Sequence, residues 1–314
     1  MDDMNQTRVT EFILMGLSDQ PDLQPALFTV FLLMYSVGLL GNGTIIKVIC
    51  AADQLHTPMY FFIGSLSLVD ICLTTVTVPS HLIHILSQRR TISYRNCITQ
   101  LFFFTMFVGI ESFLLGVMAY DRYIAICNPL HYLLMMTKRA CVLLVASSWS
   151  VGLLNAFLHT MMLAVLPFCS SNQIQSFFCD IPPMLKLSCS DTSANELLLF
   201  TEVFFLVLVS IVLIVVSYFR IISTILKIQS REGRHQAFST CSSHLVVVTL
   251  YYGTTLFIYI RPSSSYSLNK DKMVTVMYTV IIPMLNPFIY SLRNKQVKGA
   301  LGKALGRNIL CHKS

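Results

Sequence analysis

Ionisable side chains interrupt several of the long apolar stretches in this sequence. Asp121 and Arg122 are adjacent within "MAYDRYIAIC", at the end of one stretch, whereas Asp70 and Glu111 lie well inside two others. An adjacent acid and base at such a boundary can form an ion pair whose rearrangement biases a two-state structure. An ordinary interfacial ion pair without a switching role is the alternative.

The two acids inside apolar stretches predict a small-cation site. Ionisable groups in such places are costly and are therefore usually functional. Asn42 and Asn286, on two further stretches, could hydrogen-bond to Asp70 and Glu111. We predict a sodium ion at Asp70 and Glu111 that favours one arrangement of the surrounding elements, and no other cofactor. A purely structural polar cluster is the alternative interpretation.

The elements that carry these residues are predicted to be transmembrane helices. Of the 314 residues, 54% are hydrophobic and only 12% are charged, which is too apolar for a soluble globular protein. A helix needs about 20 residues to cross the hydrocarbon core, and lipid offers no hydrogen bonds to backbone groups. We therefore predict an all-α membrane protein, a seven-transmembrane helix bundle. Its spans cover approximately residues 25–51, 58–82, 98–121, 140–163, 197–226, 237–260 and 271–292.

An odd number of spans puts the two termini on opposite sides of the membrane. With the N-terminus outside, 14 of the 22 lysines and arginines fall on the inner side, as the positive-inside rule favours. Residues 1–24 then form an extracellular leader, residues 25–292 the transmembrane domain and residues 293–314 a cytoplasmic tail. In the tail, apolar residues recur at near-helical spacing between basic ones, which predicts a short amphipathic helix along the inner leaflet.

Two features of the predicted outer segments agree with this orientation. "NQT" at Asn5 is an N-glycosylation acceptor, although the same pattern also arises by chance. Four of the ten cysteines fall in outer segments, at Cys97, Cys169, Cys179 and Cys189. An even set of cysteines in an oxidising compartment predicts two disulfides, with three possible pairings.

Short motifs follow one another along the chain, one near each expected helix end. They are "GN" at Gly41, "LHTPMYFF" from Leu55, "SLSLVD" ending at Asp70, "MAYDRYIAIC" around Arg122, "SYFRI" from Ser217, "FSTCSSH" ending at His244 and "PMLNPFIYSLRN" from Pro283. On these motifs the chain resembles the vertebrate odorant (olfactory) receptors of class II type, a branch of the rhodopsin-like G-protein-coupled receptors. The resemblance covers essentially the whole chain.

The resemblance implies a switch at the inner face. In such receptors the counterpart of Arg122 is held at rest partly by the acid at Asp121 and is freed on activation to meet the C-terminal helix of a G-protein alpha subunit. The full set implied for G-protein coupling and switching is Asp121, Arg122, Tyr123, Tyr218, His244, Asn286, Pro287 and Tyr290. Tyr218 and Tyr290 would swing inward to support the freed arginine. Gln236 departs from the family's usual Lys, which leaves the strength of coupling open.

The resemblance also implies a ligand pocket in the outer half of the bundle, beneath disulfides Cys97–Cys179 and Cys169–Cys189. The expected lining is Phe104, Thr105, Val108, Gly109, Ser112, Val203, Leu206, Tyr252, Thr255 and Tyr259. Such walls are apolar with a few hydroxyls and suit a small volatile molecule. Phe104 stands where amine receptors have Asp, which argues against a charged amine. Glu202 either contacts a polar ligand or makes an interhelical hydrogen bond, and Ser176, where some relatives have His, predicts no copper dependence.

The function that the resemblance implies is binding of a small, mostly apolar odorant and activation of an olfactory-type stimulatory heterotrimeric G protein, which raises cyclic AMP. The expected partners are the odorant, the G protein and membrane lipids, with no nucleic acid. The expected location is the plasma membrane of the cilia of olfactory sensory neurons. A rhodopsin-like receptor for a non-volatile small molecule, lipid or peptide outside the nose is the alternative. An enzyme is not expected, because no nucleophile–base or metal constellation is visible.

Overall fold

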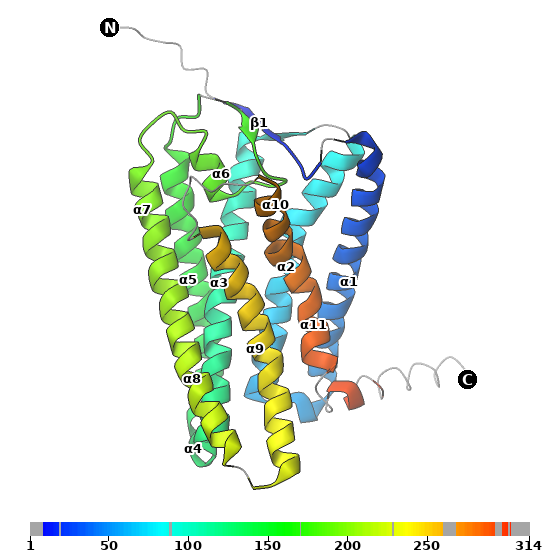
Figure 1. Ribbon diagram of the computed structural model, residues 1–314, viewed down its shortest axis with the longest axis vertical. Helices are drawn as coiled ribbons and strands as arrows, with labels where there is room; N and C mark the ends of the chain where they lie inside the picture. Colours follow the sequence, from blue (N-terminus) through cyan, green and yellow to red (C-terminus); the bar gives the residue numbers. More distant parts are fainter. Residues whose placement is uncertain are drawn as a thin grey trace, which may run out of the picture.

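The computed structural model describes residues 9–18, 20–87, 90–169, 171–227, 229–259, 268–292, 297–300 and 302. Seven rods run side by side along the long axis of the molecule (Figure 1). Five are continuous helices: α1 (Gln24–Ala51), α2 (Pro58–Ser87), α3 (Tyr94–Cys127), α5 (Lys138–Ala164) and α9 (Arg231–Tyr259). The other two each contain a π-helical segment. In the first, the π-helical segment Val203–Leu208 joins α7 (Ser193–Glu202) to α8 (Val209–Leu226). In the second, the π-helical segment Met277–Ile281 joins α10 (Leu268–Val276) to α11 (Ile282–Leu292).

These rods confirm the predicted seven-transmembrane bundle. In the part of the chain that the structure describes, six helical segments are long and apolar enough to cross a membrane. The seventh rod, α9, has 29 residues, which is ample length for a span, but its N-terminal half is rich in charged and hydroxyl side chains. Helices α2 and α3 extend beyond the predicted spans. One reason is that Ser93 caps α3, its Oγ accepting a hydrogen bond from the Asn96 N–H at 3.3 Å, so the helix begins among polar residues that a hydropathy scan leaves out.

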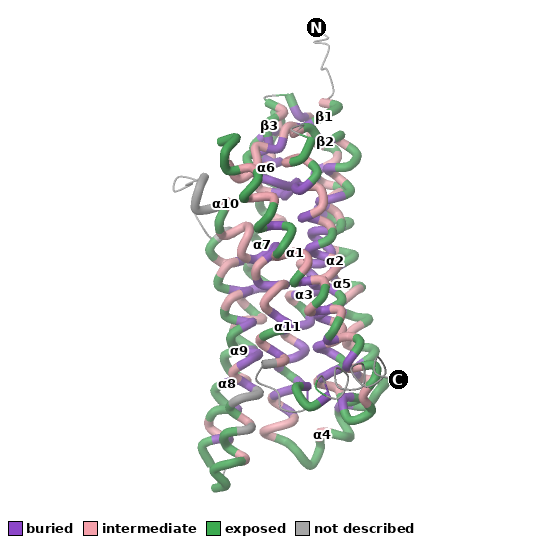
Figure 2. Tube along the Cα trace, turned by 90° about the vertical axis from the view of Figure 1, so that its right-hand side faces the viewer, coloured by how far each residue is buried: buried purple, intermediate pink, exposed green. Residues whose placement is uncertain are grey.

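Helix α3 forms the centre of the bundle. It packs against α2, α5, α8 and α9, and Figure 2 shows buried positions along the inward faces of the helices with exposed ones outside. The outward faces of the peripheral helices carry exposed apolar side chains, such as Leu40, Leu143 and Phe219. In a membrane these faces contact lipid tails, which are as apolar as the side chains themselves.

Glycines bring α3 and α5 close together. A Cβ added to Gly109 would lie 3.2 Å from the Gly152 Cα. A Cβ added to Gly152 would lie 2.5 Å from Ile110 Cγ1 and 2.7 Å from the Met106 carbonyl oxygen. Small residues allow this close backbone approach between membrane helices, so the crossing point leaves no room for any larger side chain at Gly152.

A small three-stranded sheet covers the end of the bundle that is predicted to face outside, and this end is called the outer end and the opposite one the inner end. Strand β1 (Glu11–Leu14) lies between β2 (Thr91–Ser93), with which it is antiparallel, and β3 (Gln173–Ile174), with which it is parallel. Phe12 is fully buried and meets Phe168 edge-on, with ring centroids 5.5 Å apart. Part of the predicted extracellular leader is thus an ordered strand, because Phe12 packs into an apolar site in the loop before α7.

Two disulfides fasten the loop that follows α5. They join Cys97 to Cys179 and Cys169 to Cys189, which confirms both predicted pairings. The loop contains the short helix α6 (Ile181–Leu185), whereas the short helix α4 (Pro129–Met135) lies at the opposite end of the bundle (Figure 1). The predicted glycosylation site Asn5 and most of the predicted tail helix fall outside the described residues, although residues 297–300 are helical.

Candidate functional site

At the inner end of α3, Asp121 and Arg122 are both buried, with 1% and 7% of their surface exposed. The two side chains form no ion pair with each other. Adjacent residues on a helix point in different directions, about 100° apart. Asp121 instead accepts a hydrogen bond from the hydroxyl of Tyr132 on α4, with 2.9 Å between Tyr132 Oη and Asp121 Oδ1. The direct ion pair expected from the sequence is therefore replaced by a contact between α3 and α4.

Tyr132 is well suited to hold this acid. Burial, and then the Asp121 carboxylate, raise the pKa of Tyr132 above its usual range, so its hydroxyl stays protonated and continues to donate. A hydrogen bond to a charged acceptor contributes about 1.5–3 kcal/mol. The contact therefore ties the short helix α4 to the inner end of α3.

A second contact at the inner end joins α8 to α9. Tyr218 Oη lies 2.7 Å from His244 Nδ1 and donates to the Cys241 carbonyl at 3.2 Å, and the Tyr218 and His244 rings are stacked. Arg122 Nε and the Tyr290 hydroxyl are buried nearby and have no hydrogen-bond partner among the described residues. Unsatisfied buried polar groups are costly, so a rearrangement that pairs them would be favoured. Tyr123, also predicted here, is only half-buried.

The predicted cation site is a cluster of buried oxygen atoms. Asn286 Nδ2 donates to Asp70 Oδ2 at 2.9 Å. The remaining oxygens of the cluster have no hydrogen-bond partner in the described structure: Asp70 Oδ1, both carboxylate oxygens of Glu111, Asn286 Oδ1 and Asn42 Oδ1. Hard cations such as sodium prefer oxygen ligands of this kind. No group of three or more His, Cys, Asp or Glu side chains that could hold a metal ion occurs among the described residues, so any ion here would depend on the amides as well.

Asn42, whose Oδ1 is one of these unpartnered oxygens, does not bond to Asp70. Its Nδ2 donates to the carbonyl oxygen of Pro283 at 2.9 Å and to that of Gly38 at 3.1 Å. Pro287, four residues beyond Pro283, has no N–H for that carbonyl. Asn42 therefore takes the place of the missing helical donor in α11.

The outer half of the bundle encloses a cavity of about 50 Å³. Six of the ten predicted lining residues border it: Phe104, Thr105, Val108, Gly109, Ser112 and Thr255. Six others were not in the predicted lining: Asn155, Asp180, Ile181, Leu199, Glu202 and Val207. The side chains of Val203, Leu206 and Tyr259 lie outside the described part of the chain.

Tyr252, also predicted to line the cavity, instead joins α9 to α3. Its hydroxyl donates to the Ser112 carbonyl at 3.0 Å. The neighbouring Tyr251 donates to the Val108 carbonyl at 2.8 Å, and its oxygen lies 2.7 Å from Ser112 Oγ. Val108 and Ser112 are themselves cavity-lining residues. A ligand that shifts this wall of α3 would therefore act directly on α9.

Two carboxyl groups border the cavity from different elements. Glu202 on α7 accepts a hydrogen bond from Asn155 Nδ2 at 2.7 Å and pairs with His159 on α5. Asp180 caps α6, accepting from the Ile181 N–H at 2.8 Å and from the Tyr278 hydroxyl at 3.1 Å. Burial raises the pKa of Asp180 to about 6, against the lowering effect of these two hydrogen bonds. Asp180 directly follows Cys179, which the predicted disulfide joins to Cys97 in the first turn of α3. That disulfide could have predicted that Asp180 borders this cavity.

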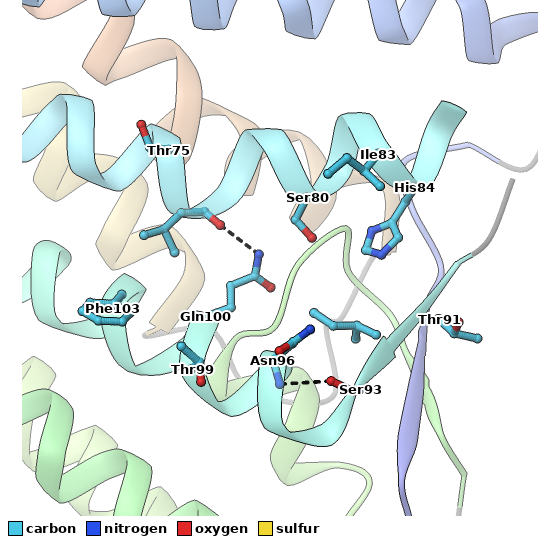
Figure 3. A pocket seen from close by; sticks show the side chains of 12 residues that line it. Thr75, Ser80, Ile83, His84, Thr91, Ser93, Asn96, Thr99, Gln100 and Phe103 are labelled. Carbon is cyan, nitrogen blue, oxygen red and sulfur yellow. Dashed lines mark hydrogen bonds between the residues drawn. The ribbon is translucent and has the colours of Figure 1, made fainter. Parts of the chain in front are cut away.

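A larger open cavity, of about 520 Å³, lies between the outer ends of α2 and α3 (Figure 3). Gln100 on α3 joins α2 to the loop at Cys179 beside this cavity. Its Nε2 donates to the Val76 carbonyl and its Oε1 accepts from the Cys179 N–H, both at 3.0 Å. Exposed side chains such as Ile83 and Phe103 line this space, so it opens to the outside of the bundle. None of the predicted ligand-binding residues borders it.

A seven-helix membrane bundle with a small outer cavity, and with buried polar contacts at the inner ends of the helices, is the architecture of a G-protein-coupled receptor. The family profile described as "Olfactory receptor" matches residues 31–308. The chain is 51% identical to olfactory receptor 1F1 of Homo sapiens over 98% of each chain. It is 52% identical to olfactory receptor 5AP2 of Mus musculus, over 96% of this chain and 95% of that protein. The chain belongs to the olfactory receptor family, whose members are receptors for odorants that couple to G proteins, not enzymes.

Proposed function

We propose that this odorant receptor binds small, mostly apolar volatile molecules in the outer cavity and activates a stimulatory G protein of the olfactory type, which raises cyclic AMP. The observation that carries the proposal is the attachment of Tyr251 and Tyr252 to the cavity wall at Val108 and Ser112. A ligand at that wall changes the position of α9. The inner half of the same helix carries His244, which holds Tyr218 of α8.

The proposed output is exposure of Arg122. Movement of α9 would break the contact between Tyr218 and His244 and let Tyr218 and Tyr290 approach the guanidinium. Arg122 would then be free to bind the C-terminal helix of the G-protein alpha subunit. The buried, unpartnered Tyr290 hydroxyl and Arg122 Nε support this step, since both gain a partner in the active arrangement.

The test is a cyclic AMP assay in cells that express the whole chain with an olfactory stimulatory G protein, against a chemically broad panel of volatile compounds. Arg122→Ala is expected to abolish the response while surface delivery stays largely intact. A fully signalling variant would remove Arg122 from the mechanism. Responses only to lipids, peptides or other non-volatile compounds would contradict the proposed ligand class.

Sodium binding at Asp70 and Glu111 belongs to the same proposal. Five unpartnered oxygens support it, three on the two acids themselves and one each on Asn42 and Asn286. An ion there would hold α2, α3 and α11 in the resting arrangement, so replacing sodium by a large organic cation is expected to raise basal signalling. Asp70→Asn is expected to remove this sensitivity. If sodium does not change the basal signalling of the wild-type receptor, the interpretation that remains is a structural polar cluster.

The proposed location is the plasma membrane of olfactory cilia, with the N-terminus outside. The two disulfides support this orientation, because both lie at the end of the bundle that carries β1 and disulfides persist in oxidising compartments. An epitope tag before residue 9 is expected to be labelled on intact cells. Labelling only after permeabilisation would show that the N-terminus faces the cytoplasm and would contradict the proposed orientation.

A further inference from the structure

Asp180 is a buried acid whose hydrogen-bond donors are both neutral. Only 5% of its surface is exposed, and its two oxygens accept from a backbone N–H and from the Tyr278 hydroxyl. No lysine, arginine or histidine borders the outer cavity among the residues that the structure describes. A buried carboxylate without a cation is unfavourable, because the loss of hydration is not repaid by an opposite charge. A ligand cation would supply that charge.

The surroundings of Asp180 also suit an ammonium group. Phe104 borders the same cavity, and its ring centroid lies 4.7 Å from that of Phe178 and 6.0 Å from that of Tyr278. Aromatic faces attract organic cations, and more strongly where water is excluded. The position on α3 where an amine receptor has its acid is occupied here by Phe104. The loop after Cys179 supplies an acid to the same cavity instead.

We propose, within the function proposed above, that the ligands of the outer cavity are small volatile amines, whose ammonium group binds the Asp180 carboxylate beside Phe104. The remaining wall suits a short apolar body, since Val108, Ile181, Leu199 and Val207 are aliphatic. Glu202 faces the same space, but its two oxygens are already engaged by the Asn155 amide and the His159 ring. Asp180 is therefore the anchor. The cavity of about 50 Å³ is smaller than such an amine, so its walls must move apart to admit even a compact one, and the shortest branched or cyclic amines are favoured.

The experiment compares amines with alcohols of the same carbon skeleton, so that only the charged group differs. Isobutylamine with isobutanol, 3-methylbutylamine with 3-methylbutanol, and cyclohexylamine with cyclohexanol are applied to cells that express the whole receptor, and cyclic AMP is measured. A charge-assisted hydrogen bond is expected to make the amine roughly 10- to 100-fold more potent than its alcohol. Cells without the receptor control for effects of the amines on intracellular pH.

Asp180→Asn removes the charge but keeps one oxygen, which can accept from the Ile181 N–H, while its amide NH2 can donate to the Tyr278 hydroxyl oxygen. The loop is therefore expected to fold. The variant should lose most of the preference for the amine, roughly tenfold or more in potency, with the alcohol response changed little. Asp191→Asn is the matched control, because Asp191 lies in the same loop, is exposed and bonds only to Ser193. This control should leave both responses unchanged.

The outcomes separate the two proposals. If alcohols and other neutral volatiles activate the wild-type receptor while amines do not, the amine inference is overturned and the odorant function stands. If Asp180→Asn weakens amines and alcohols equally, with normal surface staining, the carboxylate is structural and the inference is also overturned. If no volatile compound raises cyclic AMP in surface-expressing cells, the proposed function fails and the inference fails with it.

Discussion

Asn42 on α1 donates a hydrogen bond to the carbonyl oxygen of Pro283 on α11, with 2.9 Å between Asn42 Nδ2 and that oxygen. The carbonyl is available because Pro287 has no N–H to offer it. The neighbouring Gly41 makes room for the same proline, since a Cβ there would lie 2.8 Å from Pro287 Cγ. Both residues of the "GN" motif thus accommodate one proline on a helix far away in sequence.

Replacing Asn42 by Ala is expected to destabilise the receptor, because the buried Pro283 carbonyl loses its donor. The expected cost is about 1–3 kcal/mol, measured as a lower melting temperature of the purified receptor in detergent. In a Pro287→Ala background the restored N–H can serve Pro283, so the same change should cost less. An equal cost in both backgrounds would show that Asn42 does not act through this carbonyl. Gly43→Ala, where an added Cβ meets nothing within 4 Å, is the control.

The crossing of α3 and α5 predicts a strong effect at Gly152. Gly152→Ala forces a Cβ against Ile110 and the Met106 carbonyl, and overpacking of this kind typically costs about 1–3 kcal/mol. Gly109, which contacts Gly152, also borders the ligand cavity, so odorant ranking should change together with thermal stability. Gly116→Ala, with open space around the added atom, should change neither. A stable Gly152→Ala receptor with wild-type ligand ranking would contradict the close crossing.

The contact between Tyr132 and Asp121 predicts a change in basal signalling. Tyr132→Phe removes the hydroxyl that holds Asp121 while keeping the ring, so the resting arrangement should become less stable relative to the active one. We expect basal cyclic AMP to rise several-fold at equal surface expression. Tyr120→Phe, at an exposed position on the same helix as Asp121, is the comparison. Unchanged basal output in Tyr132→Phe would mean that the contact survives activation.

The response to amines is expected to depend on extracellular pH through Asp180. Its pKa is raised by burial to about 6, so the carboxyl is mainly ionised at neutral pH and becomes neutral as the pH falls through that value. An alkylamine stays protonated over this range, so its potency should fall between neutral pH and about pH 5. The other titratable groups facing this space are Tyr278, Glu202 and, behind it, His159. Asp180→Asn should therefore remove most of the pH dependence, and a variant as pH-sensitive as the wild type would show that Asp180 is not the group responsible.

Much of the fold was predictable from the sequence because membrane insertion depends on composition. Long apolar runs must become helices in lipid, and the seven runs became the seven rods. The ends of α2 and α3 were predicted less well. Polar caps such as Ser93, and the helical turns beyond the hydrocarbon core, leave no trace in hydropathy. The strand β1 was missed because it forms only by pairing with β2 and β3, which are distant in sequence.

The residues of the candidate site were likewise predicted only in part from the sequence. The family resemblance was enough to predict Phe104, Thr105, Val108, Gly109 and Ser112 as cavity-lining residues, and they fit one helix face, which repeats every three to four residues. Asn155 and Asp180 border the same cavity but come from other elements. No local pattern brings them together, whereas the crossing of α3 with α5 and the disulfide at Cys179 do.

The sequence by itself determined which segments enter the membrane and which polar side chains they carry, because burial of apolar surface and satisfaction of backbone hydrogen bonds are local requirements. The tertiary structure alone decided the partners of those side chains. Asp121 binds Tyr132 instead of the adjacent Arg122, and Asn42 binds Pro283 instead of Asp70. Side-chain hydrogen bonds depend on direction as well as on proximity, and direction is set only when the helices pack.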